Sequence, residues 1–240
     1  MHHAVTEKNR IHYLPIAAAV LFLLLLFSGD ARAEGLRRTR KYYRVYVVGD
    51  SRTMYMKKHV EGQAKKTTFI YKNGGGLAWF EQHGFKFLMR GVNKYAKKAK
   101  KAGKPIAVVL NWGVNTLGTP DRYAAYYRKI AKPLLRRGCR LFVMSVNPCD
   151  PARARACGHL NIPQSAGAVP AFNRRLKAGT RKNYTWIDTY SYLMKEGWVS
   201  GGGIPGGDGL HYQRPTSIKI YNYMIAAIDA AAKKTEQKAQ

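Results

Sequence analysis

Five short apolar runs, separated by segments long enough for helices, constrain the fold of this chain more than any other feature. We expect strands at 45–48, 67–71, 106–110, 141–146 and 184–187. Runs of β-branched and aromatic residues without polar alternation are typical of strands that are buried on both faces of a parallel sheet. The intervening patterns predict helices at 52–61, 77–101, 121–136, 168–178 and 216–234. This alternation predicts an α/β fold with one five-stranded parallel sheet that helices cover on both faces.

The composition fits a single folded domain that meets an anionic partner. Hydrophobic residues make up 46% of the 240-residue chain, which is enough to build a core and excludes a disordered polyelectrolyte. Three cysteines are too few for a disulfide scaffold, and they lack the paired spacing of a zinc site. The formal net charge of +29 predicts a partner such as an acidic polymer, an acidic membrane surface or nucleic acid.

The first 33 residues are typical of a targeting segment rather than of a fold. Lys8 and Arg10 precede an apolar run over 14–27, and a small-x-small site for cleavage ends at Ala33. This order indicates a cleaved secretory signal peptide, because the apolar run is shorter than the ~20 residues of a spanning helix. We therefore expect a secreted or cell-surface protein, with a retained N-terminal anchor as the alternative. The expected organisation is a signal peptide at 1–33, a basic linker at 34–41 and one domain at 42–240.

Residues that could form a hydrolytic site follow the strands of the predicted sheet. They are Ser51 after the first strand, Gly76 after the second, Asn115 after the third, and Asp208 and His211 before the last helix. Ligands bind at the carboxyl ends of the strands in open α/β sheets, so we expect these residues to lie close together. A serine, a histidine and an aspartate can act as nucleophile, general base and orienting acid, while N–H groups near a helix start can hold an oxyanion.

The same motifs resemble those of the SGNH hydrolases, also called GDSL-type hydrolases, over essentially the whole chain after residue 33. The first family block resembles Val48-Gly49-Asp50-Ser51, the third resembles Gly113-Val114-Asn115, and the last has the spacing of Asp208 and His211. The resemblance implies a flavodoxin-like three-layer α/β/α sandwich and ester hydrolysis without a metal or another cofactor. It implies a triad of Ser51, Asp208 and His211, and an oxyanion hole formed by Ser51, Asn115 and Gly76, with Gly74 as the alternative to Gly76.

Two residues depart from the family pattern. Arg52 stands where the family usually has leucine, and Thr116 stands where it usually has aspartate after the third-block asparagine. We expect Arg52 to contact the substrate and to alter substrate choice, whereas the absent aspartate removes a hydrogen-bonding group from its loop. Trp79, beside the second block, is a further candidate substrate contact, because an indole ring can stack on a sugar.

Other polar residues have plainer interpretations. Asp188, at the end of the fifth run, competes with Asp208 as triad acid, although a role in capping a loop is favoured. Cys149 and Cys157 bracket seven residues of an exported loop, so we expect a disulfide rather than two free thiols. Three histidines are interpreted as surface residues: His59, His83 and His159.

Together these features predict a secreted serine esterase that hydrolyses short acyl esters, in particular O-acetyl groups, on a carbohydrate or cell-envelope polymer. The alternatives are a lipase, a thioesterase or an acyltransferase of the same fold, or a non-catalytic surface-binding module. Nucleic-acid binding would account for the charge but for none of the motifs, so no nucleic-acid partner is expected. We expect a monomer that an anionic envelope polymer retains through its positive surface.

Overall fold

The computed structural model describes residues 35–162, 165, 167–196 and 207–237. Every element reported below belongs to the unit Leu36–Gln240. The signal peptide predicted at 1–33 lies outside the described residues. Among the helices that are described, none combines the length and the apolar character that crossing a membrane requires.

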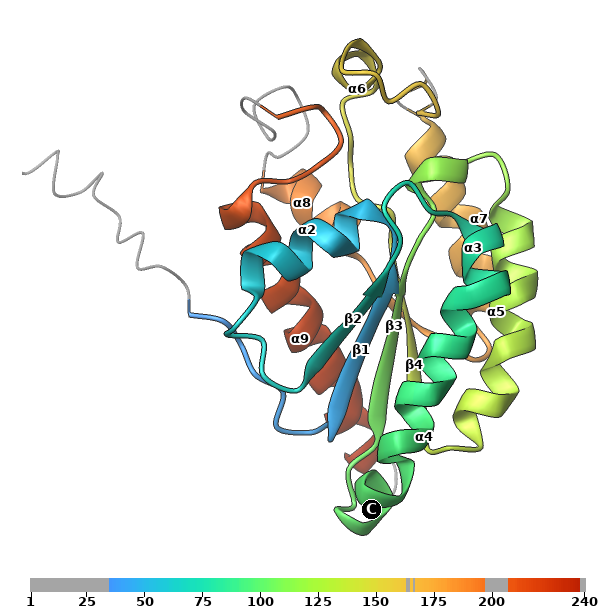
Figure 1. The fold of residues 1–240 in the computed structure, drawn as a ribbon, viewed down its shortest axis with the longest axis vertical. Helices are drawn as coiled ribbons and strands as arrows, with labels where there is room; N and C mark the ends of the chain where they lie inside the picture. The colour runs from blue at the N-terminus through green and yellow to red at the C-terminus, as the bar shows by residue number, and fades with distance from the viewer. Residues whose placement is uncertain (1–34, 163–164, 166, 197–206, 238–240) are drawn as a thin grey trace, which may run out of the picture. The chain divides into compact units, whose positions relative to one another are not determined.

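A five-stranded parallel sheet forms the centre of this unit (Figure 1). Its strands are β1 (Arg44–Gly49), β2 (Thr67–Tyr71), β3 (Ile106–Asn111), β4 (Cys139–Met144) and β5 (Thr185–Ile187). They lie in the order β2-β1-β3-β4-β5, and each neighbouring pair is parallel. This is the strand order of flavodoxin-like folds, in which the chain passes from β1 to one side and then returns to the other. The predicted α/β class and the five predicted strands are confirmed.

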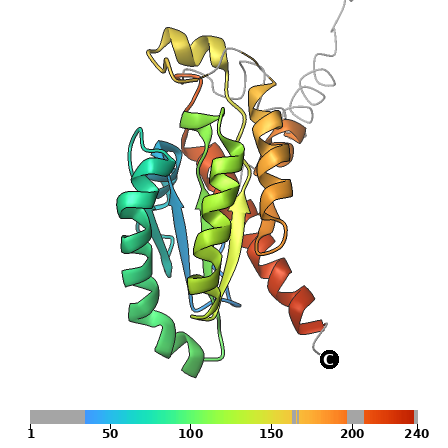
Figure 2. The ribbon, with the colours of Figure 1, turned by 90° about the vertical axis from the view of Figure 1, so that its right-hand side faces the viewer.

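Helices cover both faces of the sheet (Figures 1 and 2). One layer contains α3 (Leu77–Trp79), the π-helical turn η1 (Phe80–Gly84), α4 (Phe85–Lys101), α5 (Pro120–Leu135) and α7 (Ala168–Thr180). The other layer contains α2 (Ser51–Val60), α8 (Thr189–Lys195) and α9 (Arg214–Gln237). Two short elements follow β3 and β4 in the chain, η2 (Val114–Thr116) and α6 (Pro151–Ala156). The three-layer α/β/α arrangement is therefore as predicted.

Each central strand divides its side chains between two buried cores. Tyr46 and Val48 of β1 pack with the layer of α4 and α5, whereas Val45 and Val47 pack with α2 and α9. All six residues of β3 are buried, and its apolar side chains alternate between the same two cores. Apolar residues stabilise such a strand at every position, because burial contributes about 25 cal/mol per Å² on either face. This explains why the strand segments show no polar alternation.

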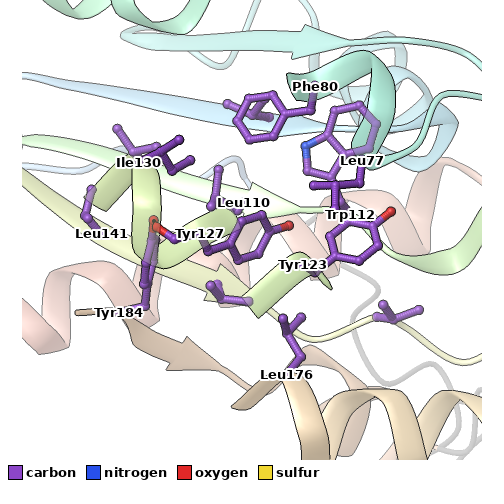
Figure 3. Close-up of a cluster of buried hydrophobic side chains, with 14 of the residues drawn as sticks. Leu77, Phe80, Leu110, Trp112, Tyr123, Tyr127, Ile130, Leu141, Leu176 and Tyr184 are labelled. Carbon is purple, nitrogen blue, oxygen red and sulfur yellow. Dashed lines mark hydrogen bonds between the residues drawn. The ribbon is translucent and has the colours of Figure 1, made fainter. Parts of the chain in front are cut away.

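Aromatic rings fill much of the core between the sheet and the layer of α3, α4 and α5 (Figure 3). Phe80 stacks on Trp112 with the ring centroids 5.7 Å apart, and Tyr123 meets Phe172 edge to face at 5.5 Å. Pairs of this kind add about 1 kcal/mol each beyond the area that they bury. Because Trp112 directly follows β3, its packing also holds the carboxyl end of that strand against the helices.

The helix predicted over 77–101 is divided in the structure. The π-helical turn η1 separates the short α3 from the long α4. Gly84 closes this turn, and a Cβ atom there would come within 2.7 Å of the rings of Phe80 and Trp79. These rings leave room for glycine at the point where the α-helical hydrogen-bond ladder is interrupted. The periodicity of the sequence shows the apolar face but not this interruption.

Two short helices, α6 and α8, are not predicted by the hydrophobic pattern. Each begins at an aspartate whose side chain caps it: Asp150 accepts the Arg153 backbone N–H at 3.0 Å, and Asp188 accepts that of Ser191 at 3.0 Å. Helices of six and seven residues are too short to show a periodic apolar face, so the capping aspartates are the informative signal. Asp188 is therefore a helix cap, as the favoured interpretation has it.

Replacing Leu110 with alanine tests how strongly the fold depends on the aromatic core. Leu110 is fully buried in β3, so Leu110→Ala is expected to lower the free energy of unfolding by about 3 kcal/mol through lost burial and a cavity. Leu135→Ala is the matched control, because that side chain is 44% exposed and should change the value by about 0.5 kcal/mol or less. Urea unfolding followed by circular dichroism measures both. Equal losses would contradict the placement of Leu110 in the core.

Candidate active site

Ser51 lies at the junction between β1 and α2, at the carboxyl edge of the sheet. Asp50 caps α2, since its side chain accepts the backbone N–H of Arg52 at 3.0 Å. Gly49 permits the tight turn from strand to helix, because a Cβ atom there would come within 2.3 Å of the Asn111 carbonyl oxygen. The serine is thereby held in the first turn of α2, where the helix dipole favours negative charge.

Ser51, His211 and Asp208 form one chain of hydrogen bonds. Ser51 Oγ lies 2.8 Å from His211 Nε2, and His211 Nδ1 lies 2.6 Å from Asp208 Oδ2. The other oxygen of Asp208 accepts the backbone N–H groups of Leu210 and His211 at 2.9 and 2.8 Å. The Asp-x-x-His spacing thus closes a turn that fixes both the carboxylate and the imidazole. The structure brings together the three residues predicted for the triad.

The surroundings of His211 favour its neutral form. Only 12% of its side chain is exposed, and burial holds the His211 pKa below its ordinary value although the Asp208 carboxylate opposes this. Partial burial would raise the Asp208 pKa, but hydrogen bonds from His211, Leu210 and His159 hold it below its ordinary value. At neutral pH the carboxylate accepts the proton-bearing Nδ1, which leaves Nε2 free to accept the Ser51 hydroxyl. This tautomer is the one that a general base requires.

A second imidazole lies on the same carboxylate. His159 Nε2 is 2.9 Å from Asp208 Oδ2, the oxygen that also binds His211. The His159 ring meets the His211 ring edge to face at 5.4 Å, and Tyr55 stacks on His211 at 4.4 Å. The interpretation of His159 as an ordinary surface residue is therefore wrong. Tyr55 could have been found from the sequence, because it lies four residues after Ser51 and so shares its face of α2.

Arg52 is buried, with 7% of its surface exposed, and its guanidinium is occupied by backbone carbonyls. Its Nε donates to the Leu210 carbonyl at 3.0 Å, and its two terminal nitrogens donate to those of Asn147 and Pro148 at 2.7 and 3.0 Å. Asn147 and Pro148 follow β4, whereas Leu210 directly precedes His211, so Arg52 joins two loops to α2. Three of the five N–H donors of Arg52 are thus used inside the protein, and its contact with the substrate stays a prediction.

Comparison with known proteins extends this picture at the level of the fold. No protein-family model matches the chain, and no curated protein matches it in sequence. A solved structure from Slackia heliotrinireducens, assigned as an SGNH hydrolase, is similar with a TM-score of 0.53 at 14% identity, covering 79% of this chain and 99% of its own. A GDSL-like lipase from Bacteroides thetaiotaomicron VPI-5482 gives 0.52 at 16% identity, covering 82% and 91%. The chain has the SGNH hydrolase fold.

Two loops of the SGNH fold carry the residues predicted for the oxyanion hole. Asn115 Nδ2 donates to the Gly75 carbonyl oxygen at 2.8 Å, which ties η2 to the loop before α3. The Gly75 carbonyl and the Gly76 N–H belong to one planar peptide unit, so this bond also fixes the direction of that N–H. Gly74 lies one peptide further away, in a left-handed conformation with φ of 64°. The structure thus couples Asn115 to Gly76 rather than to Gly74.

The third-block loop is anchored although the usual SGNH aspartate is absent. Thr116, which stands in its place, forms a hydrogen bond between its hydroxyl and the Tyr123 hydroxyl at 2.7 Å. Gly113 has φ of 136°, and a Cβ atom there would come within 2.6 Å of the Phe172 ring. Both the conformation and the close approach require glycine at this position. Thr116 therefore restores a side-chain tether by another route.

Trp79 is partly buried at the end of α3 and packs against the aromatic core between the sheet and the layer of α3, α4 and α5. Its ring lies 5.9 Å from that of Trp112 and 6.4 Å from that of Phe87. These contacts account for the conformation of Trp79 without a substrate. Its role as a substrate contact stays a prediction.

The predicted disulfide between Cys149 and Cys157 is wrong. Both are free thiols, as is the buried Cys139. The six-residue helix α6 separates them and rises about 9 Å, which exceeds the ~7 Å that two Cα atoms of a disulfide can span. Cys149 instead makes a side-chain hydrogen bond with Arg52, and Cys157 is exposed after α6.

Among the described residues, His159, Asp208 and His211 also have a spacing that could hold a metal ion. Their donor atoms lie within 4.8 Å of one another, and two imidazoles with a carboxylate are ligands that zinc accepts. In the structure the same atoms hydrogen-bond one another. An ion at Asp208 would therefore have to displace the His211 Nδ1 proton, and it would compete with the chain that leads to Ser51.

Removing the Arg52 guanidinium is expected to destabilise the protein. Arg52→Leu removes the guanidinium from three buried carbonyl oxygens, of which only that of Pro148 keeps another donor, the Tyr212 hydroxyl, so we expect the free energy of unfolding to fall by about 3 kcal/mol. Arg52→Lys should recover only part of this loss, because an ammonium cannot reproduce the planar fork. Urea unfolding measures both, with Arg181→Leu at an exposed position as the control. A loss no larger than that of the control would contradict the structural role of Arg52.

Proposed function

We propose that the protein is a serine ester hydrolase. The observation that carries the proposal is the unbroken hydrogen-bond chain from Ser51 through His211 to Asp208 on an SGNH hydrolase fold. Ser51 Oγ attacks the acyl carbonyl while His211 Nε2 takes its proton, and the imidazolium then gives that proton to the leaving alcohol. Asp208 holds the imidazole and stabilises its charge. Water, deprotonated by His211, finally releases the acyl group from Ser51.

Three N–H donors are assigned to the oxyanion of the intermediate: the backbones of Ser51 and Gly76 and the side chain of Asn115. Ser51 begins α2 and Gly76 precedes α3, and the first N–H groups of a helix have no intrahelical partner. Asn115 donates one of its two amide hydrogens to Gly75, and the other is assigned to the oxyanion. Each donor of this kind contributes on the order of 3 kcal/mol to stabilising the transition state.

The surroundings of the triad favour short acyl groups. Tyr55 and His159, which contact His211 and Asp208, are polar or amphipathic. Among the described residues, the exposed large apolar side chains are dispersed over α4, α5, α8 and the loop after α6. A long acyl chain would therefore bury little of its surface. We infer an O-acetyl or similarly short ester, carried by a carbohydrate or envelope polymer; a lipase, a thioesterase and an acyltransferase are the alternatives.

A panel of aryl esters from acetyl to octanoyl tests the reaction and the acyl length together. We expect kcat/KM to be highest for acetyl, and Ser51→Ala to lower kcat at least about a thousandfold because the nucleophile is lost. A fluorophosphonate should label Ser51 in the wild type. Ser191→Ala, at an exposed serine in the first turn of α8 whose hydroxyl donates to Asp188, is the matched control and should keep full activity. A kcat/KM that rises towards octanoyl would indicate a lipase, and a folded wild type without labelling or turnover would favour the binding module.

We propose further that the domain is exported and that an anionic envelope polymer retains it. The signal-like segment at 1–33 contains only 3 of the 42 basic residues, so the positive charge belongs to the domain. A pocket of about 610 Å³ between α4 and α5 supports this partner. It has no acidic lining residue and five cationic ones: Lys97, Lys100, Lys104, Arg136 and Arg137. We call it the basic pocket.

The place and the lining of the basic pocket favour a polymer that is not nucleic acid. No aromatic ring lines the pocket, so it lacks the stacking platforms on which bases bind. Two lining residues, Pro105 and Gly138, directly precede β3 and β4, which puts the pocket at the amino edge of the sheet. It therefore lies at least one strand length, roughly 20 Å, from the carboxyl edge, so an anion bound there leaves the triad free.

Binding of fluorescent polyphosphate tests this partner. The triple change K97Q/K100Q/K104Q should weaken binding about a hundredfold, since each lysine contributes about 1 kcal/mol beside an anionic surface. K58Q/K65Q/K182Q removes the same charge from exposed positions outside the pocket and should weaken binding much less. Turnover of a neutral aryl ester should be unchanged in both. Equal weakening in both variants, or binding that survives molar salt, would contradict the assignment.

A further inference from the structure

Asp208 accepts more hydrogen bonds than a triad acid needs. Its Oδ1 accepts two backbone N–H groups, from Leu210 and His211. Its Oδ2 faces two imidazoles, His211 Nδ1 at 2.6 Å and His159 Nε2 at 2.9 Å. The hydrolytic mechanism uses only the bond to His211. The contact with His159 therefore requires its own explanation.

Both imidazoles donate to the same oxygen. Hydrogen bonds hold the Asp208 pKa below its ordinary value against the effect of burial, so the carboxylate has no proton to give and acts only as an acceptor. His211 then bears its proton on Nδ1, and His159 bears one on Nε2. The shorter bond belongs to His211. One oxygen thus fixes the tautomer of the base and the orientation of the second ring.

His159 is held in place by its own backbone. Its N–H donates to the Ala154 carbonyl at 2.9 Å, which anchors it to α6, and its carbonyl accepts the Ile162 N–H at 3.2 Å. The start of α6 is tied to the loop of Asp208 as well, because the Asp150 N–H donates to the Gly209 carbonyl at 2.8 Å. Two separate contacts thus join the α6 segment to the loop of the triad acid. The His159 side chain is 30% exposed and cannot swing freely away from that loop.

We propose that His159 is a positioning residue, which holds the Asp208 carboxylate for His211 and divides its charge between two imidazoles. The inference rests on the proposed hydrolase function. The hydrogen bond of the His159 side chain goes to Asp208 and not to Ser51 or His211, so the carboxylate is the group that His159 positions. Its effect is to keep the triad acid in one orientation and to moderate how strongly that acid stabilises the His211 imidazolium.

The charged groups around His211 determine the expected effect on pH dependence. They are Asp208 from its own loop, Arg52 from α2 and His159 from the segment after α6, while the Tyr55 ring covers one face. Burial is the main cause of the lowered His211 pKa; Asp208 opposes it, and Arg52 and His159 reinforce it. Removing His159 takes away a neighbour that lowers the His211 pKa, and it takes away a competing donor on Asp208. Both changes stabilise the imidazolium, so the His211 pKa should rise.

Kinetics of His159→Ala, with an acetyl aryl ester as substrate, test the proposal. We expect kcat to fall about tenfold with KM nearly unchanged, because one bond to a charged acceptor is lost. The acid limb of the pH profile of kcat/KM should move to higher pH, since more base is protonated at a given pH. His159→Gln keeps an N–H donor and should recover kcat to within about threefold of the wild type. His83→Ala, at an exposed histidine on η1, is the matched control and should change neither quantity.

A readout that does not depend on turnover separates this proposal from the hydrolase function. The Nδ1 proton of His211 lies in a short hydrogen bond and should give a low-field resonance, which His159→Ala shifts and His83→Ala does not. If the wild type hydrolyses no ester but His159→Ala still shifts the resonance, the proposed hydrolase function fails and the positioning role of His159 stands. The proposal would be overturned if a folded His159→Ala variant had the kcat, the acid limb of the pH profile and the His211 resonance of the wild type. If that variant does not fold, His159→Leu, which also removes the donor to Asp208 but keeps more of the side-chain volume, takes its place, and a wild-type acid limb and resonance in that variant would overturn the proposal.

A metal role for the same side chains is the competing explanation. Stoichiometric zinc binding that raises activity and is lost in His159→Ala would overturn the positioning role. Two results together would support the positioning role: a chelator leaves activity and the resonance unchanged, and added zinc inhibits the enzyme. Zinc would then compete with the His211 proton for Asp208.

Discussion

The arrangement of the site depends on one buried guanidinium. A charged side chain that leaves water needs hydrogen-bond acceptors in the interior, and Arg52 finds three carbonyl oxygens on two loops. Its planar fork accepts few other geometries, so the loop after β4 and the loop that carries His211 take fixed positions relative to α2. Ser51 is the neighbouring residue on α2. The nucleophile and the base are therefore connected through one side chain as well as through their own hydrogen bond.

The strand order determines which loops can meet at Ser51. β1 lies between β2 and β3, so the loops that follow these two strands border the carboxyl end of β1 from opposite sides. The bond from Asn115 to Gly75 joins these two loops to each other. Arg52 joins α2 to the loop after β4 and to the loop before α9. These four loops are thus held by polar contacts with one another or with α2, and none of them has to be rigid by itself.

Features that depend on local patterns could be predicted from the sequence, and features that depend on distant partners could not. Unbroken apolar runs indicate the strands, and the triad follows from its positions at the ends of elements. The short helices α6 and α8 have capping signals but no periodic face. Arginine is rarely buried, so Arg52 is expected in solvent until its partners are known. One of those partners, Leu210, lies 158 residues further along the chain. In the same way, His159 contacts Asp208 across 49 residues of sequence, which no local pattern indicates.

The buried charges next to Ser51 also connect the architecture to the chemistry. Burial raises the pKa of Asp50 to about 6 while Arg52 opposes this shift, so above that pH the interior holds one carboxylate and one guanidinium. Below it Asp50 takes up a proton, and the guanidinium remains without a compensating charge. Burial lowers the pKa of His211, and Arg52 adds to this effect. The side chain that positions the His211 loop thus also helps to keep the base of that loop neutral.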